Sequence, residues 1–168
     1  MLILNYISFF FLIILTFLSI SGYGAVFNNH KNINIFEKLF LGFIFLAFFN
    51  TLFHFFFKLN FYINLLIFLL GIIFFKINKL NIDKKKLFYF LIIIFLIPIF
   101  ITQKYHEDFG YYHLPYALSF LEEKIIFGLA NSNIAYTYNS IWLNVYPTFF
   151  TETKNYDFLT LPTFILFI

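Results

Sequence analysis

Residues 39–75 read LFLGFIFLAFFNTLFHFFFKLNFYINLLIFLLGIIFF, and this stretch decides the fold class. It contains two apolar runs, residues 39–57 and 59–75, which are separated by a single lysine, Lys58. A helix needs about 20 mostly apolar residues to cross a bilayer, and about 17 to 25 are tolerated. Both runs meet that length, and residues 58–60 leave room only for a tight turn. The stretch therefore predicts two antiparallel membrane helices that lie side by side.

Two further apolar runs of spanning length, residues 2–20 and residues 87–103, lie on either side of this pair. None of the four runs contains Asp, Glu, Lys or Arg. The chain of 168 residues is 62% hydrophobic and 11% charged, and its mean hydropathy of +0.87 is far above the range of soluble domains. We therefore predict an all-α membrane protein whose residues 1–103 form four transmembrane helices.

The loop between the third and fourth runs carries five lysines and a single acidic residue, Asp83. A short loop this basic stays on the cytoplasmic side of the membrane. Following the chain from that loop places the turn at Lys58 and everything after Gln103 on the opposite side. Residues 104–157 are therefore predicted to be extracytoplasmic.

The two ends of the chain leave questions of processing and length open. Small residues at 21–25 would suit cleavage by a signal peptidase. The first run is therefore either a membrane helix or a cleaved signal peptide. It lacks the basic segment that precedes the apolar part of such signals. Residues 158–168 form an apolar run that is too short to cross a bilayer. We expect them to be the start of a further transmembrane helix in a longer protein.

Composition and motifs exclude several classes of function. The net charge of +3 comes from lysines spread over short loops, and the chain has no Arg and no contiguous basic face, so we exclude nucleic-acid binding. The absence of Cys removes disulfides and thiol nucleophiles. No phosphate-binding Gly loop, nucleophile elbow or zinc-protease signature occurs, and the sequence identifies no cofactor.

The residues best equipped for chemistry follow the fourth apolar run. Glu107 and Asp108 are adjacent carboxylates, an arrangement in which like charge can raise one of the two pKa values. With His106 and His113 nearby, Asp108 is a candidate general base for a hydroxyl group. The same residue types also bind divalent metals, and they are also common in ordinary polar loops, so all three interpretations remain open. We assign no metal ligand.

A short amphipathic helix is predicted directly after this acidic segment. Pro115 suits the first turn of a helix, apolar residues recur at helical spacing, and Gly128 is expected to end the helix. Such a helix lies along the membrane interface. Residues 131–144 carry Asn, Ser, Tyr and Trp but no charge, which fits a structured loop at the level of the lipid headgroups.

A few polar or small residues lie within the apolar runs. His54 is either a functional intramembrane residue or a neutral imidazole hydrogen-bonded to a neighbouring helix. Asparagine side chains in membrane helices commonly join one helix to another, and glycines allow close packing. The asparagines are Asn5, Asn50 and Asn64, and the glycines are Gly42 and Gly71.

Four short motifs occur in order after the fourth run. They are DFGYYHLP at 108–115, FLEE at 120–123, GLAN at 128–131 and YNSIW at 138–142. This order resembles that of bacterial polytopic membrane proteins with an Asp-x-Gly-x-Tyr-His segment, a short helix, a Gly-Leu-Gly-Asn element and an aromatic-Asn-Ser-x-Trp element, a family similar to the GT-C superfamily of glycosyltransferases. The resemblance covers about residues 105–143.

The resemblance implies a bacterial inner-membrane enzyme of envelope polysaccharide or glycolipid assembly that transfers sugar from a polyprenyl-phosphate-linked donor. It implies that Asp108 is the base that activates the acceptor, with Glu107 as the alternate. It implies substrate-binding roles for Tyr112, His113, Asn131, Asn139 and Trp142. Two other classes remain open, namely a transporter, flippase or export subunit for lipid-linked saccharides, and a structural membrane subunit.

Overall fold

The computed structural model describes residues 2–27, 34–80, 84, 85, 88, 89, 91, 110, 111, 114–132, 134, 136, 141–149 and 161–166. This part of the chain is mostly helical, as predicted. Its helices are α1 (Leu2–Phe27), α2 (Ile35–Phe56), α3 (Phe61–Ile77), α6 (Leu114–Glu122), α7 (Leu129–Ser132), η3 (Ile141–Asn144), α8 (Tyr146–Phe149) and α9 (Leu161–Leu166).

Two of the described helices are long and apolar enough to cross a membrane. They are α1, over Ile7–Val26, and α2, over Ile35–Phe56. The third predicted span corresponds to α3, which is a shorter apolar helix of 17 residues. Most of the fourth predicted span, residues 87–103, lies outside the described residues.

Helix α2 begins before the apolar run that predicted it. The backbone N–H of Asn34 donates to the carboxylate of Glu37 at 3.2 Å, which is half of a capping box at the start of the helix. Glu37 and Lys38 therefore belong to the first turns of α2, rather than to the preceding loop. Glu37 suits this position because its carboxylate accepts from a backbone N–H at the start of the helix, where N–H groups lack partners within the helix.

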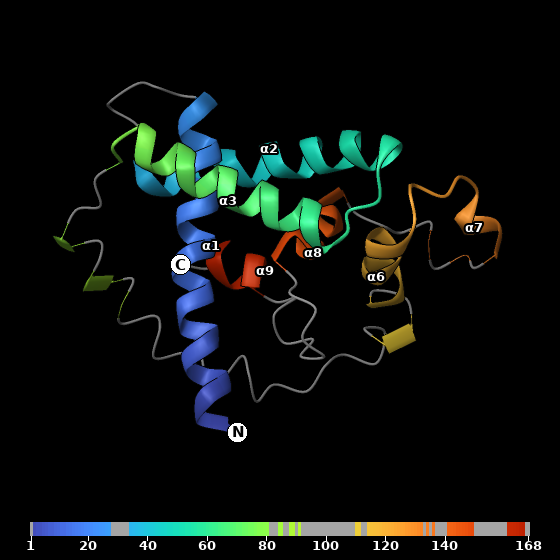
Figure 1. Ribbon diagram of the computed structural model, residues 1–168, viewed down its shortest axis with the longest axis horizontal. Coiled ribbons are helices and arrows are strands. Elements are labelled where there is room, and N and C mark those ends of the chain that lie inside the picture. The colour runs from blue at the N-terminus through green and yellow to red at the C-terminus, as the bar shows by residue number, and fades with distance from the viewer. Residues whose placement is uncertain are drawn as a thin grey trace.

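Helix α1 is the centre of the helical core, and it crosses both α2 and α3 (Figure 1). The chain reverses at residues 57–60 as predicted, but α2 and α3 contact each other far less than each contacts α1. The prediction that α2 and α3 pack side by side is therefore wrong. A tight turn between two helices fixes only their near ends, and here α1 occupies the space between the rest.

Glycines bring the three backbones together at this crossing. A Cβ atom on Gly22 would collide with the backbone of Gly71 in α3, and one on Gly24 would collide with the backbone of Lys38 in α2. Residues two apart point to different faces of a helix, so these two glycines serve two different neighbours. A Cβ atom on Gly42 would likewise strike the backbone of α1. The predicted packing role of Gly42 and Gly71 is confirmed.

Two side chains of α1 add hydrogen bonds to this contact. The Ser19 hydroxyl donates to the carbonyl oxygen of Phe68 at 2.9 Å, and the Tyr23 hydroxyl donates to that of Ile67 at 2.6 Å. Ser21 and Ala25 are also buried. Close packing thus accounts for the small residues near the end of α1, which the sequence alone also allows as a cleavage site.

Large apolar side chains cover the outer faces of α2 and α3. Monomeric soluble proteins rarely expose apolar patches of this extent, and such patches mark membrane or protein contacts. The exposed residues include Phe40, Phe48, Leu52, Phe55 and Phe56 on α2 and Leu65, Leu66, Leu69, Leu70, Ile73 and Ile77 on α3. These faces need either lipid or further helices to cover them.

Helix α9 packs against α1 and buries Leu161, Phe164 and Ile165 in the core. It belongs to the apolar run at 158–168, which we expect to start a further transmembrane helix. That expectation stays a prediction, because only residues 161–166 of the run are described.

Candidate functional site: a docked segment, a polar seam and a neutral cavity

Helix α6 docks at the turn between α2 and α3. The backbone N–H of Leu59 donates to the carbonyl oxygen of Phe120 at 2.7 Å, and the Phe120 ring meets the His54 ring edge to face at 4.8 Å. The Tyr116 ring also packs against Phe120, with the centroids 4.6 Å apart, and burial raises the pKa of the Tyr116 phenol. Figure 1 shows α6 beside the end of α3 nearest this turn. Helix α6, which follows Glu107 and Asp108 in the sequence, is therefore bound to the end of α2 and α3 at their shared turn.

Helix α6 is shorter than predicted, since it ends at Glu122 and not at Gly128. The chain leaves the helix because its next backbone groups bond to α2. The carbonyl oxygen of Glu123 pairs with the His54 ring, and the N–H of Ile125 donates to the His54 carbonyl oxygen at 3.2 Å. Gly128 instead adopts a positive φ of 79° at the turn into α7.

His54 is buried, and its Nε2 lies 3.0 Å from the carbonyl oxygen of Glu123. A carbonyl oxygen only accepts, so Nε2 carries a proton in this contact. In the neutral ring Nδ1 is then an acceptor, and it has no hydrogen-bond partner among the described residues. A hydrogen bond of the His54 ring is therefore present, but its partner is the backbone carbonyl of the residue that follows α6 and not a neighbouring membrane helix. A functional role for His54 stays a prediction.

Four residues form a connected set of hydrogen bonds between α2 and the η3–α8 segment, which we call the polar seam. Its members are Asn50, Thr51, Asn144 and Thr148. The amide of Asn50 donates to the Asn144 carbonyl oxygen at 2.8 Å and to the Thr148 hydroxyl at 2.7 Å. The Asn144 amide donates to the Thr51 hydroxyl. A buried seam of this kind fixes the position of η3 and α8, because each broken bond leaves a buried polar group unpaired.

Asn64 is predicted to join two helices, and the structure shows that it does not. Its amide nitrogen donates to the Leu59 carbonyl oxygen at 2.5 Å, in the turn that precedes its own helix. The side chain thereby stabilises the start of α3, together with the Asn60 side chain, which accepts from the Ile63 N–H at 3.1 Å. Asn5 lies in α1, and its side chain is outside the described residues.

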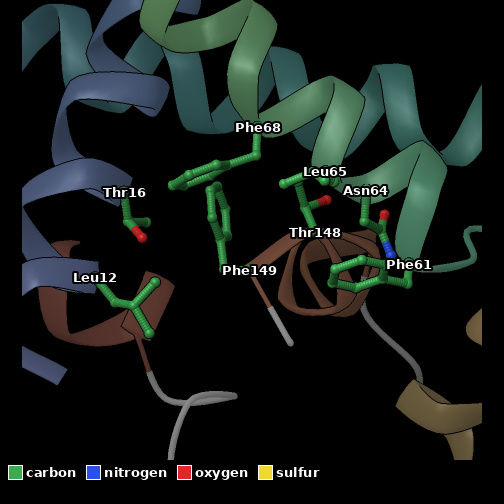
Figure 2. A pocket seen from close by; sticks show the side chains of 8 residues that line it. All are labelled: Leu12, Thr16, Phe61, Asn64, Leu65, Phe68, Thr148 and Phe149. Carbon is green, nitrogen blue, oxygen red and sulfur yellow. The ribbon is translucent and has the colours of Figure 1, made fainter. Parts of the chain in front are cut away.

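A cavity of about 140 Å³ lies between α1, α3 and α8. Figure 2 shows the edge-to-face pair Phe68 and Phe149 in its middle, with Thr16 on one side and Asn64 on the other. The lining residues carry no charge, and they are Leu12, Thr16, Phe61, Asn64, Leu65, Phe68, Thr148 and Phe149. Since Thr148 also belongs to the polar seam, the seam and the cavity share one side chain.

Most of the site residues that the sequence suggests lie outside the described residues, namely Glu107, Asp108, Tyr112, His113 and Asn139. The two that are described do not come together. Asn131 is exposed on α7, which lies apart from the helical core in Figure 1. Trp142 lies in η3, and its ring packs on Phe43 of α2 with the centroids 5.1 Å apart.

Sequence reasoning did not identify the residues that complete the seam and the cavity, which are Thr16, Thr51, Asn144 and Thr148. Asn50 was the available signal, because a buried amide in an apolar helix requires a partner. The identity of the partner was not available, since Asn144 and Thr148 lie 94 and 98 residues further along the chain.

The described residues thus define a helical protein with two helices of membrane-spanning length and a docked polar segment. Residues 2–168 match the family described as Domain of unknown function (DUF8201), and the chain belongs to that family. Neither the curated proteins nor the solved structures contain a match to the chain.

Proposed function

We propose that this chain is part of a bacterial inner-membrane glycosyltransferase with four membrane spans in residues 1–103. It transfers sugar from a polyprenyl-phosphate-linked donor in envelope polysaccharide or glycolipid assembly. Asp108 acts as the base on the acceptor hydroxyl, with Glu107 as the alternate, and residues 104–157 lie on the extracytoplasmic side. The ordered motifs in residues 105–143 and the basic loop between the third and fourth spans support this proposal.

The docking of α6 at the α2–α3 turn is the observation that carries the proposal. A lipid-linked sugar holds its phosphate at the level of the headgroups, so an enzyme that uses it needs its reactive groups at that depth. Lys58 in the turn is exposed and suits the headgroup level, and α6 bonds to the next residue, Leu59. Asp108 precedes the first residue of α6 by only six positions in the sequence.

The test is sugar transfer from a polyprenyl-phosphate-linked donor by the purified full-length protein. Positioned general bases contribute about 10² to 10⁴ in rate, so we expect Asp108→Asn to lower turnover by that factor. Glu122→Gln is the matched control, because Glu122 is an exposed carboxylate at the end of α6. Unaltered turnover in Asp108→Asn would remove the base assignment, and a selective loss in Glu107→Gln would transfer the role to Glu107.

A second candidate is a transporter, flippase or export subunit for lipid-linked saccharides. The buried polar side chains of α2 favour it, because polar groups inside membrane helices often mark transport paths. Asn50 and His54 are both at most 2% exposed, and most of the residues around them in α2 are apolar. Movement of a lipid-linked oligosaccharide across proteoliposomes without any sugar transfer would favour this candidate over the enzyme.

A further inference from the structure

Helix α2 and the turn after it complete the C-terminal end of helix α6. The last carbonyl groups of a helix have no partner within the helix and must find one elsewhere. The Phe120 carbonyl oxygen accepts from the backbone N–H of Leu59 at 2.7 Å. The Glu123 carbonyl oxygen, just past the end of α6, accepts from the His54 ring at 3.0 Å. Both of these carbonyl groups are therefore satisfied from outside α6.

His54 makes three contacts at this end of α6. Besides the bond from Nε2 to Glu123, its carbonyl oxygen accepts from the Ile125 N–H at 3.2 Å, and its ring meets the Phe120 ring edge to face at 4.8 Å. His54 and Phe120 are each 2% exposed, so water does not compete for these contacts. The bond through the His54 carbonyl would survive a substitution, whereas the Nε2 bond and the ring contact belong to the side chain.

The acidic segment is joined to the other end of the same helix. Helix α6 has nine residues from Leu114, and Asp108 precedes Leu114 by six positions. A helix is stiff over this length, so a fixed C-terminal end also restricts the position of the N-terminal end. Since the His54 ring is buried, it can influence Asp108 through α6 but cannot itself act on an acceptor in solvent.

We infer that His54 is a positioning residue, which sets the place of the segment that carries Asp108 by holding the far end of α6. The inference rests on the proposed role of Asp108 in sugar transfer, and it assigns to that site a residue from helix α2. The part of His54 that matters is an N–H donor at the depth of Nε2, because the Glu123 carbonyl oxygen only accepts.

Two substitutions of His54 differ only in the depth of the donor. In His54→Gln the amide nitrogen stands as far from Cβ as Nε2 does, so it can still donate to Glu123. In His54→Asn the same amide is one methylene group shorter and falls short of that carbonyl oxygen. Both variants bury the same polar group, so a difference between them reports the bond to Glu123 and not the loss of an imidazole.

The first measurement is a distance between two spin labels on the full-length protein in lipid nanodiscs. The labels are attached at Tyr62→Cys on α3 and at Tyr111→Cys, three residues after Asp108; both tyrosines are 78% exposed, and the chain has no natural Cys. We expect one narrow distance distribution in the parent and in His54→Gln, and a clearly broader one in His54→Asn. Phe120→Leu, a milder change that removes the ring contact and no hydrogen bond, should also broaden it. Unchanged distributions in both His54→Asn and Phe120→Leu would overturn the inference.

The second measurement is sugar transfer from the polyprenyl-phosphate-linked donor. Displacement of a catalytic group by about 1 Å can cost about 10²-fold in rate, so kcat should fall about tenfold to 10²-fold in His54→Asn, with little change in KM, and should recover in His54→Gln. An equal loss of kcat in both variants would contradict a positioning role. If the parent transferred no sugar, the proposed enzyme would fail, and the spin-label distances alone would decide whether His54 holds the acidic segment in place.

Discussion

Asn50 shows how a single side chain can fix a distant segment. Its amide nitrogen donates to both Asn144 and Thr148, and both bonds are buried. Its side-chain oxygen has no partner among the described residues, so the contribution of Asn50 to folding comes through the nitrogen. At the scale of the residue, Asn50 is one of the contacts that hold η3 and α8 against α2, and it bonds to both segments.

Removal of the Asn50 amide should destabilise the protein by about 1 to 3 kcal/mol, because a buried acceptor on Asn144 loses its donor. We expect this loss for Asn50→Leu in chemical unfolding of the purified protein in detergent micelles. The matched control is Asn78→Leu, since the Asn78 amide bonds locally to Phe74 within the end of α3. Its effect should be clearly smaller.

A double-mutant cycle isolates the bond between Asn50 and Thr148. If the 2.7 Å contact contributes to stability, Asn50→Leu combined with Thr148→Val should cost less than the two single changes together. Independent sites add within about 0.3 to 0.5 kcal/mol, so additivity within that range would count against the bond.

At the scale of the element, the crossing of α1 with α2 and α3 depends on glycine. Gly42→Ala adds one methyl group where the backbone of Ile20 lies. On helix propensity alone this change would stabilise α2 by about 1 kcal/mol, whereas overpacking of a tight core costs about 1 to 3 kcal/mol. We expect net destabilisation in the same unfolding measurement, and stabilisation would contradict the crossing.

Gly110→Ala is the control for that substitution. A Cβ atom at Gly110 would have nothing within 4 Å, and the residue is exposed. Exposed changes of this kind are usually within about 0.5 kcal/mol of the parent. If Gly110→Ala changed the free energy of unfolding as much as Gly42→Ala, the effect at Gly42 could not be assigned to its tight packing.

The helices themselves were largely predictable from the sequence, whereas their packing was not. Helices α1 to α3 follow from apolar length, because uninterrupted apolar runs determine which segments can be buried or lie in lipid. The crossing through α1 could not be predicted, since it depends on small residues in three separate segments that meet only in the folded chain. The polar seam was not predictable for the same reason. The sequence indicates that Asn50 needs a hydrogen-bond partner, but only the folded structure identifies Asn144 as that partner.

At the scale of the whole molecule, helices with apolar outer faces carry a docked segment at one end. The outer faces of α2 and α3 require an apolar environment, and α6 is fastened where those two helices meet. Asp108 is proposed as the base from the sequence, and its proposed extracytoplasmic position rests on the basic loop at residues 76–86. Membrane orientation is thus the claim on which both the enzyme and its extracytoplasmic chemistry depend.

Single-cysteine labelling tests that orientation directly, since the chain has no natural Cys. Glu122→Cys and Lys84→Cys place a thiol at two exposed positions, one at the end of α6 and one in the basic loop. In intact spheroplasts, a membrane-impermeant maleimide should label the cysteine at position 122 at once and the one at position 84 only after permeabilisation. The reverse pattern would place the acidic segment in the cytoplasm, and labelling of both in intact spheroplasts would mean that no membrane separates them.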